Sequence, residues 1–537
     1  MALHIYNSAS RRVEEFAPLH RGEVRMYVCG PNLYAPSHVG HAFSYLVFDM
    51  VRRYLEYRGY QVNHVQNFTD IEDRIIETAR DQGTAVQALA RQYADRFLRE
   101  MHALNVRPAV HYPRATEMIP KMIEMIQTLI ARGFAYAVDG DVFFRVSAFP
   151  AYGRLSGRSL DEMQAGSRIE VDPRKEHPMD FALWKAAKAG EPAWDSPWGP
   201  GRPGWHIECS AMSLALLGDQ LDIHGGGQDV IFPHHENEIA QSEAFTGRAP
   251  FVRYWVHNGL LRLPEDAEKM TRHLGNIVTI EEALQRYHPD AIRVFAFSAH
   301  YRSPATWTDG SLEAASRGAE RLRTALEHAQ SVIREAGSRK SHTAPGRKGA
   351  AAASPGPAAG SEAREPLQPD AARAAFEAAM DDDFNTPRAF AAIFDLATEV
   401  NRTADAVAKA DAAEAGRHVA GLERGAAMLR ELAGVLGLTL TASLTPAQRA
   451  GLLQLARELS AEHPELFDHE HPVMQTVRSA SAGDAVSGED LIQLIGEGRM
   501  RARRRKDWAT GDAIRSRLQS LGILIEDSPT GFTWRLR

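Results

Sequence analysis

The stretch that decides the fold is Tyr27-Val-Cys-Gly-Pro31, followed shortly by His38-Val-Gly-His41. Its pattern predicts a short apolar strand, a Gly/Pro turn and a helix that opens with two histidines around a glycine. A helix N-terminus leaves backbone N–H groups unpaired and carries partial positive charge, so it is a good seat for phosphate. His38 and His41 can add hydrogen bonds to phosphate oxygens. We therefore expect a nucleotide site directly after this strand.

The residues around this stretch alternate strand-like and helical runs. Strands are expected at 26–29 and 61–65, and helices at 43–58 and 70–82. This order is typical of a parallel sheet that binds its ligands at the carboxyl ends of the strands. The strand pattern resumes at 220–223 and 254–257. The sequence therefore predicts an α/β, Rossmann-type catalytic domain.

Composition changes along the chain predict further segments. A hairpin around Asp139-Gly-Asp141 opens a region rich in Gly, Pro and Trp that looks like an insertion, and the chain is largely helical after about residue 310. Residues 338–370 hold almost no large apolar group, which is typical of a flexible linker. The expected segments are the first half of the catalytic domain at 1–133, the insertion at 134–203, the second half at 204–260, a stem-contact region at 261–312, a helical domain at 313–465 and a small C-terminal module at 466–537.

Bulk properties narrow the class of protein. A chain of 537 residues is too long for one core, and no apolar run is long enough to cross a bilayer. Two cysteines cannot form a disulfide framework and no secretory signal is evident, so we expect a cytoplasmic protein that does not bind membranes. The net charge of −7 means that any nucleic acid must be bound by a local basic surface.

Three distant segments could together bind a metal ion. Cys29 ends the first strand, and Cys209 lies 180 residues later in Gly204-Trp-His-Ile-Glu-Cys209. His234 and Glu238 are four residues apart and would share one face of a helix. Two thiolates, an imidazole and a carboxylate suit tetrahedral zinc.

Spacing alone does not distinguish this metal site from two buried structural cysteines beside a polar helix start. His235 and Glu236 remain competing ligands, because dispersed ligands have no short regular pattern.

A run of three glycines precedes the candidate metal helix in Asp222-Ile-His-Gly-Gly-Gly-Gln-Asp229. As a loop after a strand, it would let a planar or phosphorylated ligand approach the backbone, and Asp229 could accept hydrogen bonds from ribose hydroxyls. Such a run is more often only a turn.

Each of two basic segments could likewise be either a binding site or ordinary surface. Lys269 and Arg272 lie on a polar stretch where they could stabilise charge on a triphosphate. Six of the eight residues at 499–506 are basic, and Trp508 beside them could stack on an RNA base. In isolation, either segment would usually be solvated surface.

Taken in order, these segments resemble the cysteinyl-tRNA synthetases, a family of class I aminoacyl-tRNA synthetases. The resemblance covers nearly the whole chain apart from 338–370. The order in which the motifs occur is more specific to this family than any single motif. The motifs are Tyr27-Val-Cys-Gly-Pro31, His38-Val-Gly-His41, Asn67-Phe-Thr-Asp-Ile-Glu-Asp-Arg-Ile-Ile76, Gly204-Trp-His-Ile-Glu-Cys-Ser210, His224-Gly-Gly-Gly-Gln-Asp229, Phe232-Pro-His-His-Glu-Asn-Glu238, Met380-Asp-Asp-Asp-Phe-Asn-Thr-Pro387 and Lys506-Asp-Trp508 through Asp512.

The resemblance implies a role for each motif residue. The family's activity would be ATP-dependent formation of cysteinyl-adenylate and transfer to tRNA(Cys), by a monomer that holds one Zn²⁺ and uses ATP with Mg²⁺. Zinc would bind the thiolate of substrate cysteine and so reject serine without an editing domain. The implied zinc ligands are Cys29, Cys209, His234 and Glu238. The implied catalytic residues are His38, His41, Lys269 and Arg272. The implied substrate and ATP contacts are Gly30, Thr69, Trp205, His224, Gly226, Gly227, Asp229, Lys269 and Arg272. The implied anticodon contacts are Arg503, Trp508 and Asp512.

The chain departs from the family pattern in three places. The family's Lys-Met-Ser-Lys-Ser signature is Lys269-Met-Thr-Arg-His273, so its second lysine is Arg272, which keeps the charge but changes the donor geometry. Ala35 replaces an acidic residue, and Glu72-Asp-Arg74 replaces Asp-Asp-Lys. These changes bear on the rate of activation rather than on the fold.

Two other functions remain open at this stage. One is a related cysteine ligase that uses a small amino-sugar acceptor, but such enzymes lack a C-terminal RNA-binding module. The other is a tRNA-binding paralogue with weak or lost activation, which the altered Lys269–His273 signature would favour. Both cysteines, both histidines and the glycine run argue for an active ligase.

Overall fold

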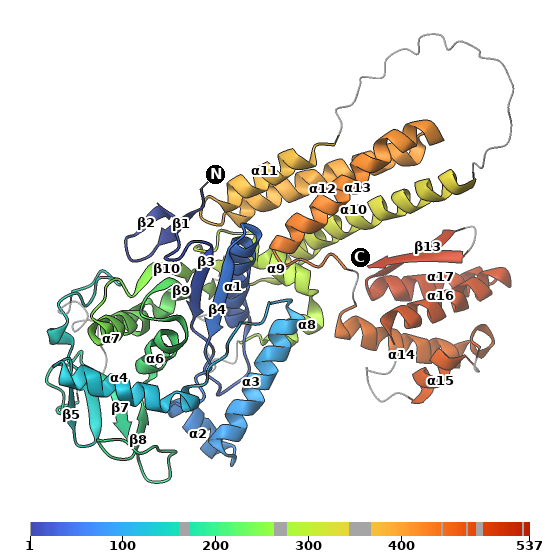
Figure 1. Cartoon of the computed structure of the whole chain (residues 1–537). Helices are drawn as coiled ribbons and strands as arrows, with labels where there is room; N and C mark the ends of the chain where they lie inside the picture. The colour runs from blue at the N-terminus through green and yellow to red at the C-terminus, as the bar shows by residue number, and fades with distance from the viewer. Residues whose placement is uncertain are drawn as a thin grey trace.

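A four-stranded parallel sheet forms the centre of the N-terminal α/β domain (Figure 1). The computed structural model describes residues 2–159, 172–262, 277–342, 367–441, 444–468, 471–479, 487–528 and 531–536. The sheet order is β10-β9-β3-β4, with β3 at Glu23–Val28, β4 at Gln61–Gln66, β9 at Leu221–Gly227 and β10 at Val252–Asn258. The predicted α/β class and parallel sheet are confirmed.

The strand β9 runs further than the sequence pattern predicts. Gly225, Gly226 and Gly227 are its last residues rather than a loop that follows it, so that expectation is wrong. The reason is a close approach by helix α1 (Val39–Tyr57): a Cβ on Gly225 would lie 2.1 Å from Cε1 of Phe48. The missing side chain therefore lets the helix pack directly on the strand.

Helices and short strands surround this sheet. The helix expected at 70–82 begins only at residue 73. The Asp70 carboxylate accepts the backbone N–H (2.9 Å) and the hydroxyl (2.6 Å) of Thr116, so it cannot cap a helix that starts at residue 70. The remaining elements up to residue 306 are β1 (His4–Asn7), β2 (Arg12–Glu15), α2 (Asp73–Asp81), α3 (Val86–Ala103), α4 (Ile119–Ala131), β5 (Ala135–Val138), β6 (Asp141–Phe144), β7 (Phe181–Ala186), β8 (Gly201–Pro203), α6 (Trp205–Leu217), α7 (Glu236–Thr246), β11 (Leu261–Arg262), α8 (Ile280–Arg286), α9 (Pro289–Phe297) and β12 (Ala305–Thr306).

The segment expected to be an insertion forms its own sheet. Strands β5, β6, β7 and β8 pair antiparallel in that order, at the end of the molecule away from the helical domain (Figure 1). The turn between β5 and β6 contains Asp139 and Gly140, both with positive φ. This is the hairpin that the Asp-Gly pair predicts.

Long helices follow the α/β domain. They are α10 (Asp309–His342), α11 (Pro369–Met380), α12 (Thr386–Lys409) and α13 (Ala412–Val435). The expected flexible stretch at 338–370 overlaps the end of α10 and the first residues of α11, and most of the rest lies outside the described residues. None of the helices that the structure describes is both long and apolar enough to span a bilayer.

The C-terminal module has a core of its own. It contains α14 (Pro446–Glu462), α15 (Pro472–Ser479), α16 (Gly488–Arg504), α17 (Trp508–Ser520), β13 (Ile523–Ser528) and β14 (Gly531–Leu536). Leu452, Leu455 and Leu459 of α14 pack in the same apolar cluster as Ile495 and Ile514. The expected boundary at 465/466 therefore moves to the segment before α14.

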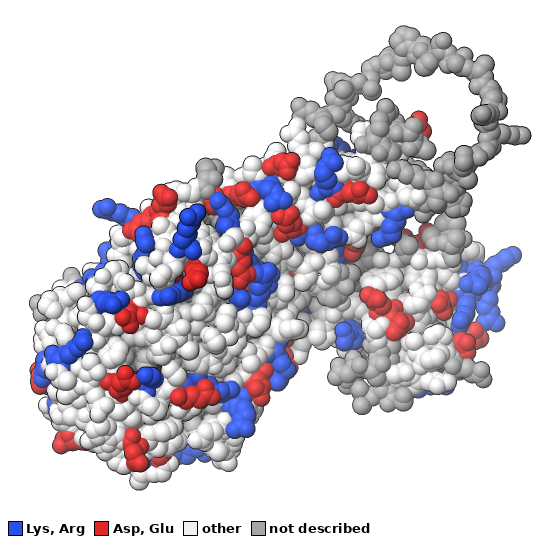
Figure 2. Space-filling view, in the orientation of Figure 1, with Lys and Arg blue, Asp and Glu red and all other residues white. Residues whose placement is uncertain are grey.

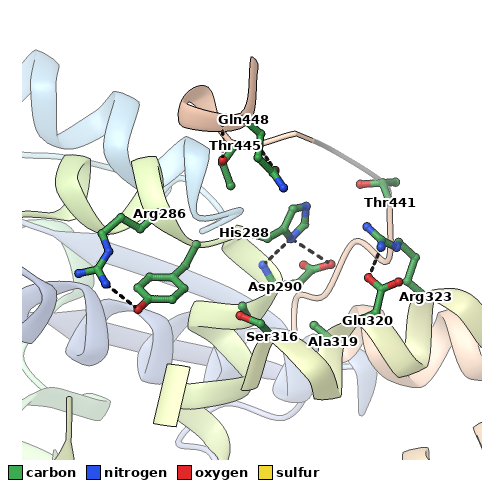
Figure 3. A pocket seen from close by; sticks show the side chains of 12 residues that line it. Arg286, His288, Asp290, Ser316, Ala319, Glu320, Arg323, Thr441, Thr445 and Gln448 are labelled. Carbon is green, nitrogen blue, oxygen red and sulfur yellow. Dashed lines mark hydrogen bonds and ion pairs between the residues drawn. The ribbon is translucent and has the colours of Figure 1, made fainter. Parts of the chain in front are cut away.

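A polar cavity marks where this module joins the rest of the chain (Figure 3). Helices α9 and α10 form one side, and Thr445 and Gln448 at the start of α14 lie across from them. The Asp290 carboxylate accepts the backbone N–H groups of Thr439 and Leu440, both at 2.9 Å. Hydrogen bonds to α9 thus anchor the connecting segment.

The Gly225 contact yields a stability prediction. We expect Gly225→Ala to lower stability by about 1–3 kcal/mol, because the new methyl group must displace the Phe48 ring. The measurement is the apparent midpoint of chemical unfolding of the full chain.

Gly421→Ala is the matched control, because a Cβ there meets nothing within 4 Å and lies inside a helix. The double variant Gly225→Ala/Phe48→Leu should recover part of the loss. An unchanged midpoint for Gly225→Ala would contradict the packing argument.

Candidate metal centre and nucleotide site

Four potential metal ligands from distant segments meet at the carboxyl end of the parallel sheet. Cys29 follows β3, Cys209 lies on α6, His234 lies in the π-helical turn Ile231–His235, and Glu238 lies in the first turn of α7. One donor atom from each lies within 4.8 Å of the others. The two sulfurs are 3.9 Å apart, Cys29 Sγ is 3.7 Å from Glu238 Oε1, and His234 Nε2 is 3.0 Å from the same oxygen.

This donor set fits zinc. Tetrahedral coordination with Zn–S bonds of about 2.3 Å places two sulfur ligands about 3.8 Å apart. The observed 3.9 Å between the Cys29 and Cys209 sulfurs agrees with that spacing and is far longer than a disulfide bond. Two sulfurs with one nitrogen and one oxygen also favour zinc over a hard cation such as Mg²⁺.

A second set of donors shares two members with the first. Cys29 and Glu238 also lie within 4.8 Å of His224 and His235. His235 Nε2 is 3.3 Å from Cys29 Sγ, and His224 Nε2 is 2.8 Å from Glu238 Oε2. His235 therefore remains a competing ligand, whereas the set with Cys209 has the larger number of soft donors.

Glu236, the other competing ligand, is bound elsewhere. Its carboxylate accepts the backbone N–H groups of Gly153 at 2.9 Å and Ser156 at 2.8 Å, in the segment between β6 and β7 of the insertion. It therefore faces away from the sulfurs.

Charge coupling in the cluster shifts each ligand's pKa. Burial alone would raise the pKa of Glu238, but His224 and His234 lower it to about 2. Burial opposes protonation of His234, but Glu238 and Cys209 raise its pKa to about 10. Burial, together with hydrogen bonding to Cys209, raises the pKa of the Cys29 thiol well above its ordinary value. The pKa of Cys209 is lowered to about 6 against the effect of its burial, by hydrogen bonding from Cys29 and by the charge of His234. Without a metal ion the cluster thus carries protons that binding would release.

A hydrogen-bonded chain supports the centre, and the sequence analysis missed two of its members. Asn67 Oδ1 accepts the backbone N–H of Gly30 at 2.8 Å and lies 3.7 Å from Cys209 Sγ. The Thr69 hydroxyl donates to Glu208 Oε2 at 2.8 Å. Asn67 and Glu208 lie inside quoted motifs, and only their position next to Thr69 and Cys209 could have drawn attention to them.

The expected substrate contacts lie around the same edge. A Cβ on Gly30 would lie 1.5 Å from the Asn67 carbonyl oxygen, so only glycine fits between these two strand ends. The Trp205 ring is 37% exposed and its centroid lies 4.4 Å from that of His234, so it flanks the candidate metal ligands. Thr69 is buried.

The two histidines of the first motif form the N-terminus of α1. His38 is its N-cap, and its Nδ1 accepts the backbone N–H of His41 at 3.3 Å. Their rings stack with centroids 3.7 Å apart. The predicted helix start and its histidine pair are thus present in the structure, beside the carboxyl end of β3.

The remaining expected nucleotide contacts divide into two groups. His224, Gly226 and Gly227 are on β9, where His224 and Gly226 are buried, and Asp229 is exposed just beyond the strand. Lys269 and Arg272 lie outside the described residues.

Basic side chains gather at one end of the C-terminal module. Figure 2 shows Lys and Arg side chains where α16 and α17 meet in Figure 1. The Arg503 guanidinium lies 5.1 Å from the centroid of the Trp508 ring, which is 55% exposed. Asp512 is exposed one turn further along α17. An exposed aromatic ring with an arginine against it is a suitable surface for stacking a base.

Three family models match the chain. Residues 15–317 match the class I (C) tRNA synthetase catalytic domain, residues 375–441 match the DALR domain, and residues 497–535 match the cysteinyl-tRNA ligase anticodon binding domain. Together they cover the parallel sheet, the insertion, helices α12 and α13 and much of the C-terminal module.

Curated proteins and solved structures agree with these matches. The cysteine--tRNA ligase of Dehalococcoides mccartyi strain BAV1 is 46% identical over the whole of both chains, and that of Pelotomaculum thermopropionicum is 47% identical over 99% of both. The Mycobacterium tuberculosis methionyl-tRNA synthetase bound by methionyl-adenylate shares the fold, with a TM-score of 0.56 at 18% identity over 81% of this chain and 94% of that one. The sheet, the order of the motifs and these full-length matches lead to one conclusion: the chain belongs to the cysteine--tRNA ligase family.

Proposed function

We propose that the chain is a cysteine–tRNA ligase that activates L-cysteine with ATP and transfers the cysteinyl group to the 3′ end of tRNA(Cys). The observation that supports this most is the meeting of its two cysteines, 180 residues apart in sequence, at a sulfur–sulfur distance of 3.9 Å. They lie at the edge of the sheet where parallel α/β folds bind nucleotides. Relatives with the corresponding name match the full chain.

Cys29, Cys209, His234 and Glu238 would hold one zinc ion. When bound, the ion supplies a Lewis-acidic position that takes the thiol of cysteine far better than the hydroxyl of serine. Trp205 and Thr69 would line the amino-acid side of the site, and Asn67 and Glu208 hold the neighbouring backbone and hydroxyl in place.

The first step requires mainly positioning. The cysteine carboxylate attacks the α-phosphorus of ATP, which gives cysteinyl-adenylate and releases pyrophosphate. The partial positive charge at the N-terminus of α1, with the side chains of His38 and His41, would bind the triphosphate of Mg²⁺-bound ATP. Lys269 and Arg272 would stabilise its charge, and Asp229 would accept hydrogen bonds from the ribose. Gly30, His224, Gly226 and Gly227 would let the nucleotide approach the strand ends.

The rest of the chain would bind tRNA. In the transfer step a terminal ribose hydroxyl of tRNA attacks the activated carbonyl and AMP leaves. We assign the catalytic role to 1–133 and 204–260, the insertion to 134–203, the stem contact to 261–312 and tRNA docking to the helices from 313 onward. Arg503, Trp508 and Asp512 would contact the anticodon. We further propose that the enzyme acts as a monomer in the cytoplasm, where its two free thiols stay reduced.

The anticodon-binding match at 497–535 argues against an amino-sugar acceptor. The assembled cysteine, histidine and glutamate cluster argues against a paralogue that has lost activation.

The proposed function predicts selective charging of tRNA. Zinc-loaded protein should attach labelled cysteine to a tRNA(Cys) transcript, with serine disfavoured by about 10⁴-fold or more. Cys209→Ala should lose both zinc and charging, whereas Arg248→Met, at an exposed arginine before the amino end of β10, should keep both. The measurements are the amount of acid-stable label attached to tRNA and the zinc content of each protein. Well-folded, zinc-replete protein that charges no tRNA would sink the proposal.

The coupled pKa shifts predict a pH dependence of zinc affinity. Between pH 7 and 8, Cys29 and His234 are protonated without metal because their pKa values are raised, while Cys209 and Glu238 are mostly ionised because theirs are lowered. Binding should therefore release about two protons, and the apparent affinity should fall about 100-fold from pH 8 to pH 7.

Zinc titration by calorimetry in two buffers of different ionisation enthalpy measures the number of protons released. Affinity that does not change between pH 7 and pH 8 would contradict this assignment of protons.

The exposed Trp508 ring predicts a specific effect on tRNA. Trp508→Ala should raise the KM for tRNA about tenfold, because stacking on one base contributes about 1–3 kcal/mol. Trp508→Phe keeps a stacking ring and should retain most of the affinity. Pyrophosphate exchange with cysteine and ATP should not change in either variant, and a parallel loss of exchange would argue against an RNA contact.

A further inference from the structure

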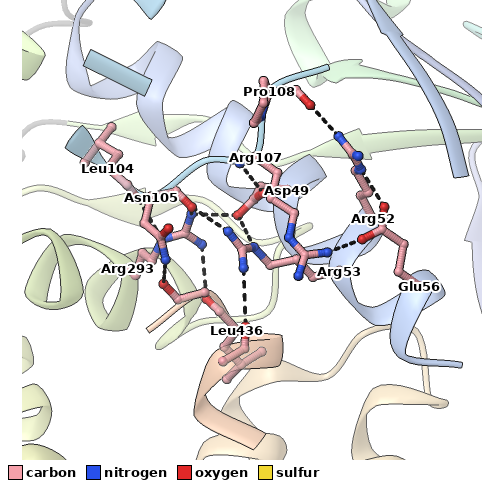
Figure 4. Close-up of polar contacts among 12 residues, drawn as sticks. Asp49, Arg52, Arg53, Glu56, Leu104, Asn105, Arg107, Pro108, Arg293 and Leu436 are labelled. Carbon is pink, nitrogen blue, oxygen red and sulfur yellow. Dashed lines mark hydrogen bonds and ion pairs between the residues drawn. The ribbon is translucent and has the colours of Figure 1, made fainter. Parts of the chain in front are cut away.

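A buried ionic cluster connects the helix that carries the nucleotide motif to the helical domain (Figure 4). Its centre is Arg293 on α9, whose side chain is fully buried. Its Nη2 donates to Asp49 Oδ2 of α1 and to the Asn105 carbonyl oxygen, both at 2.6 Å. Its Nε donates to the Leu104 carbonyl at 2.8 Å, and its Nη1 donates to the Leu436 carbonyl at 3.1 Å. One guanidinium thus joins four segments of the chain.

The charges in this cluster explain why it is stable. Arg53 also binds Asp49, with Nε 2.7 Å from Oδ2, so two cations share one buried carboxylate. Leu104 is the C-cap of α3 and Leu436 follows the last residue of α13. Helix C-termini carry partial negative charge and unpaired carbonyls, and these two ends compensate the second guanidinium.

The fit around Arg293 is close on the side of the helical domain. A Cβ on Gly437 would lie 2.2 Å from Arg293 Nη1, and Gly437 has φ of +74°. Asn105 Nδ2 donates to the Gly437 carbonyl at 2.7 Å. Gly437 belongs to the segment at 375–441 that matches the DALR domain. The contact therefore fixes one particular docking of that domain.

Helix α1 is tied to the helical domain at a second point, near its C-terminal end. There the Tyr54 hydroxyl donates to Asp381 Oδ1 at 2.6 Å, and Arg58 forms an ion pair with the same carboxylate. Other contacts, such as the Asn105 to Gly437 hydrogen bond, would keep the domain attached after the loss of Arg293. Without the buried guanidinium, however, its orientation relative to His38 and His41 would be fixed less tightly.

We propose that Arg293 is a positioning residue for the tRNA-dependent step: it fixes the angle between the helical domain and helix α1, so that the tRNA end reaches the adenylate. This inference rests on the proposed ligase activity. Arg293 touches no substrate, and cysteine activation needs only the catalytic domain. The two half-reactions should therefore respond differently to its loss.

The test compares pyrophosphate exchange with tRNA charging in the full-length, zinc-loaded protein. Arg293→Met leaves Asp49 paired with Arg53 and should lower kcat/KM for tRNA at least tenfold, while the KM for ATP and cysteine in exchange stays within twofold. Arg293→Lys keeps the cation but not the planar fork of donors, so its charging should be intermediate. Gly437→Ala perturbs the same contact from the opposite side and should show the same split.

Arg248→Met is the matched control, because this arginine precedes the amino end of β10, away from the carboxyl ends of the strands, and is 64% exposed, so both activities should stay within twofold. Parallel loss of exchange and charging in the folded variants would overturn the proposal. An Arg293→Met protein that fails to fold, with unaltered activities in Arg293→Lys and Gly437→Ala, would overturn it too, by showing a role in folding alone. A wild-type protein without either activity would instead refute the ligase proposal on which this one rests.

Discussion

The parallel pairing of β3 with β9 is the constraint on which the rest of the site depends. The backbone N–H of Cys29 donates to the Gly225 carbonyl at 3.2 Å, so the first cysteine is held against the last residues of β9. The chain beyond β9 then turns at once into His234 and Glu238, while α6 places Cys209 over the same strand ends. Because strand register is a property of many hydrogen bonds together, a slip of one residue would separate all four side chains.

The same geometry concentrates charge where water is excluded. Burying a carboxylate, a thiolate and an imidazolium is costly unless each is paired, and the pairs here are close: His224 and His234 both contact Glu238, within 3.0 Å. Behind them, His235 Nδ1 lies 2.8 Å from His257 Nε2, and His257 Nδ1 lies 2.8 Å from the Ser8 hydroxyl. The polar network thus continues to the N-terminal hairpin, which explains why so many buried histidines are tolerated in one core.

Much of this arrangement could be predicted from the sequence, for reasons tied to particular residues. The β–α–β–α alternation and the His38–His41 helix start have local signatures, as does the Asp139-Gly140 turn, and the structure contains all three. Three glycines in a row predict a loop, whereas the structure has them in β9, because the Phe48 ring that takes the Cβ position of Gly225 comes from another element. The sequence predicts the start of the C-terminal module at residue 466, after α14, because helical periodicity continues through that helix. Only the packing of α14 with α16 and α17 shows that it belongs to the C-terminal core. Asn67, Glu208 and Arg293 act through tertiary contacts that spacing does not encode.

Helix α1 shows how one rigid element can serve two distant tasks. Its N-terminus presents His38 and His41 beside the strand ends, and Asp49, ten residues into the helix, lies about 15 Å further along the axis. The buried Asp49 carboxylate is balanced by two guanidiniums, and two helix C-termini compensate the second of these. Few other arrangements are available, because each would leave a buried charge unpaired. Any displacement of the helical domain must therefore either move α1 with it or break the cluster. The ionic cluster and the helix N-terminus that carries His38 and His41 are in this way parts of one rigid element.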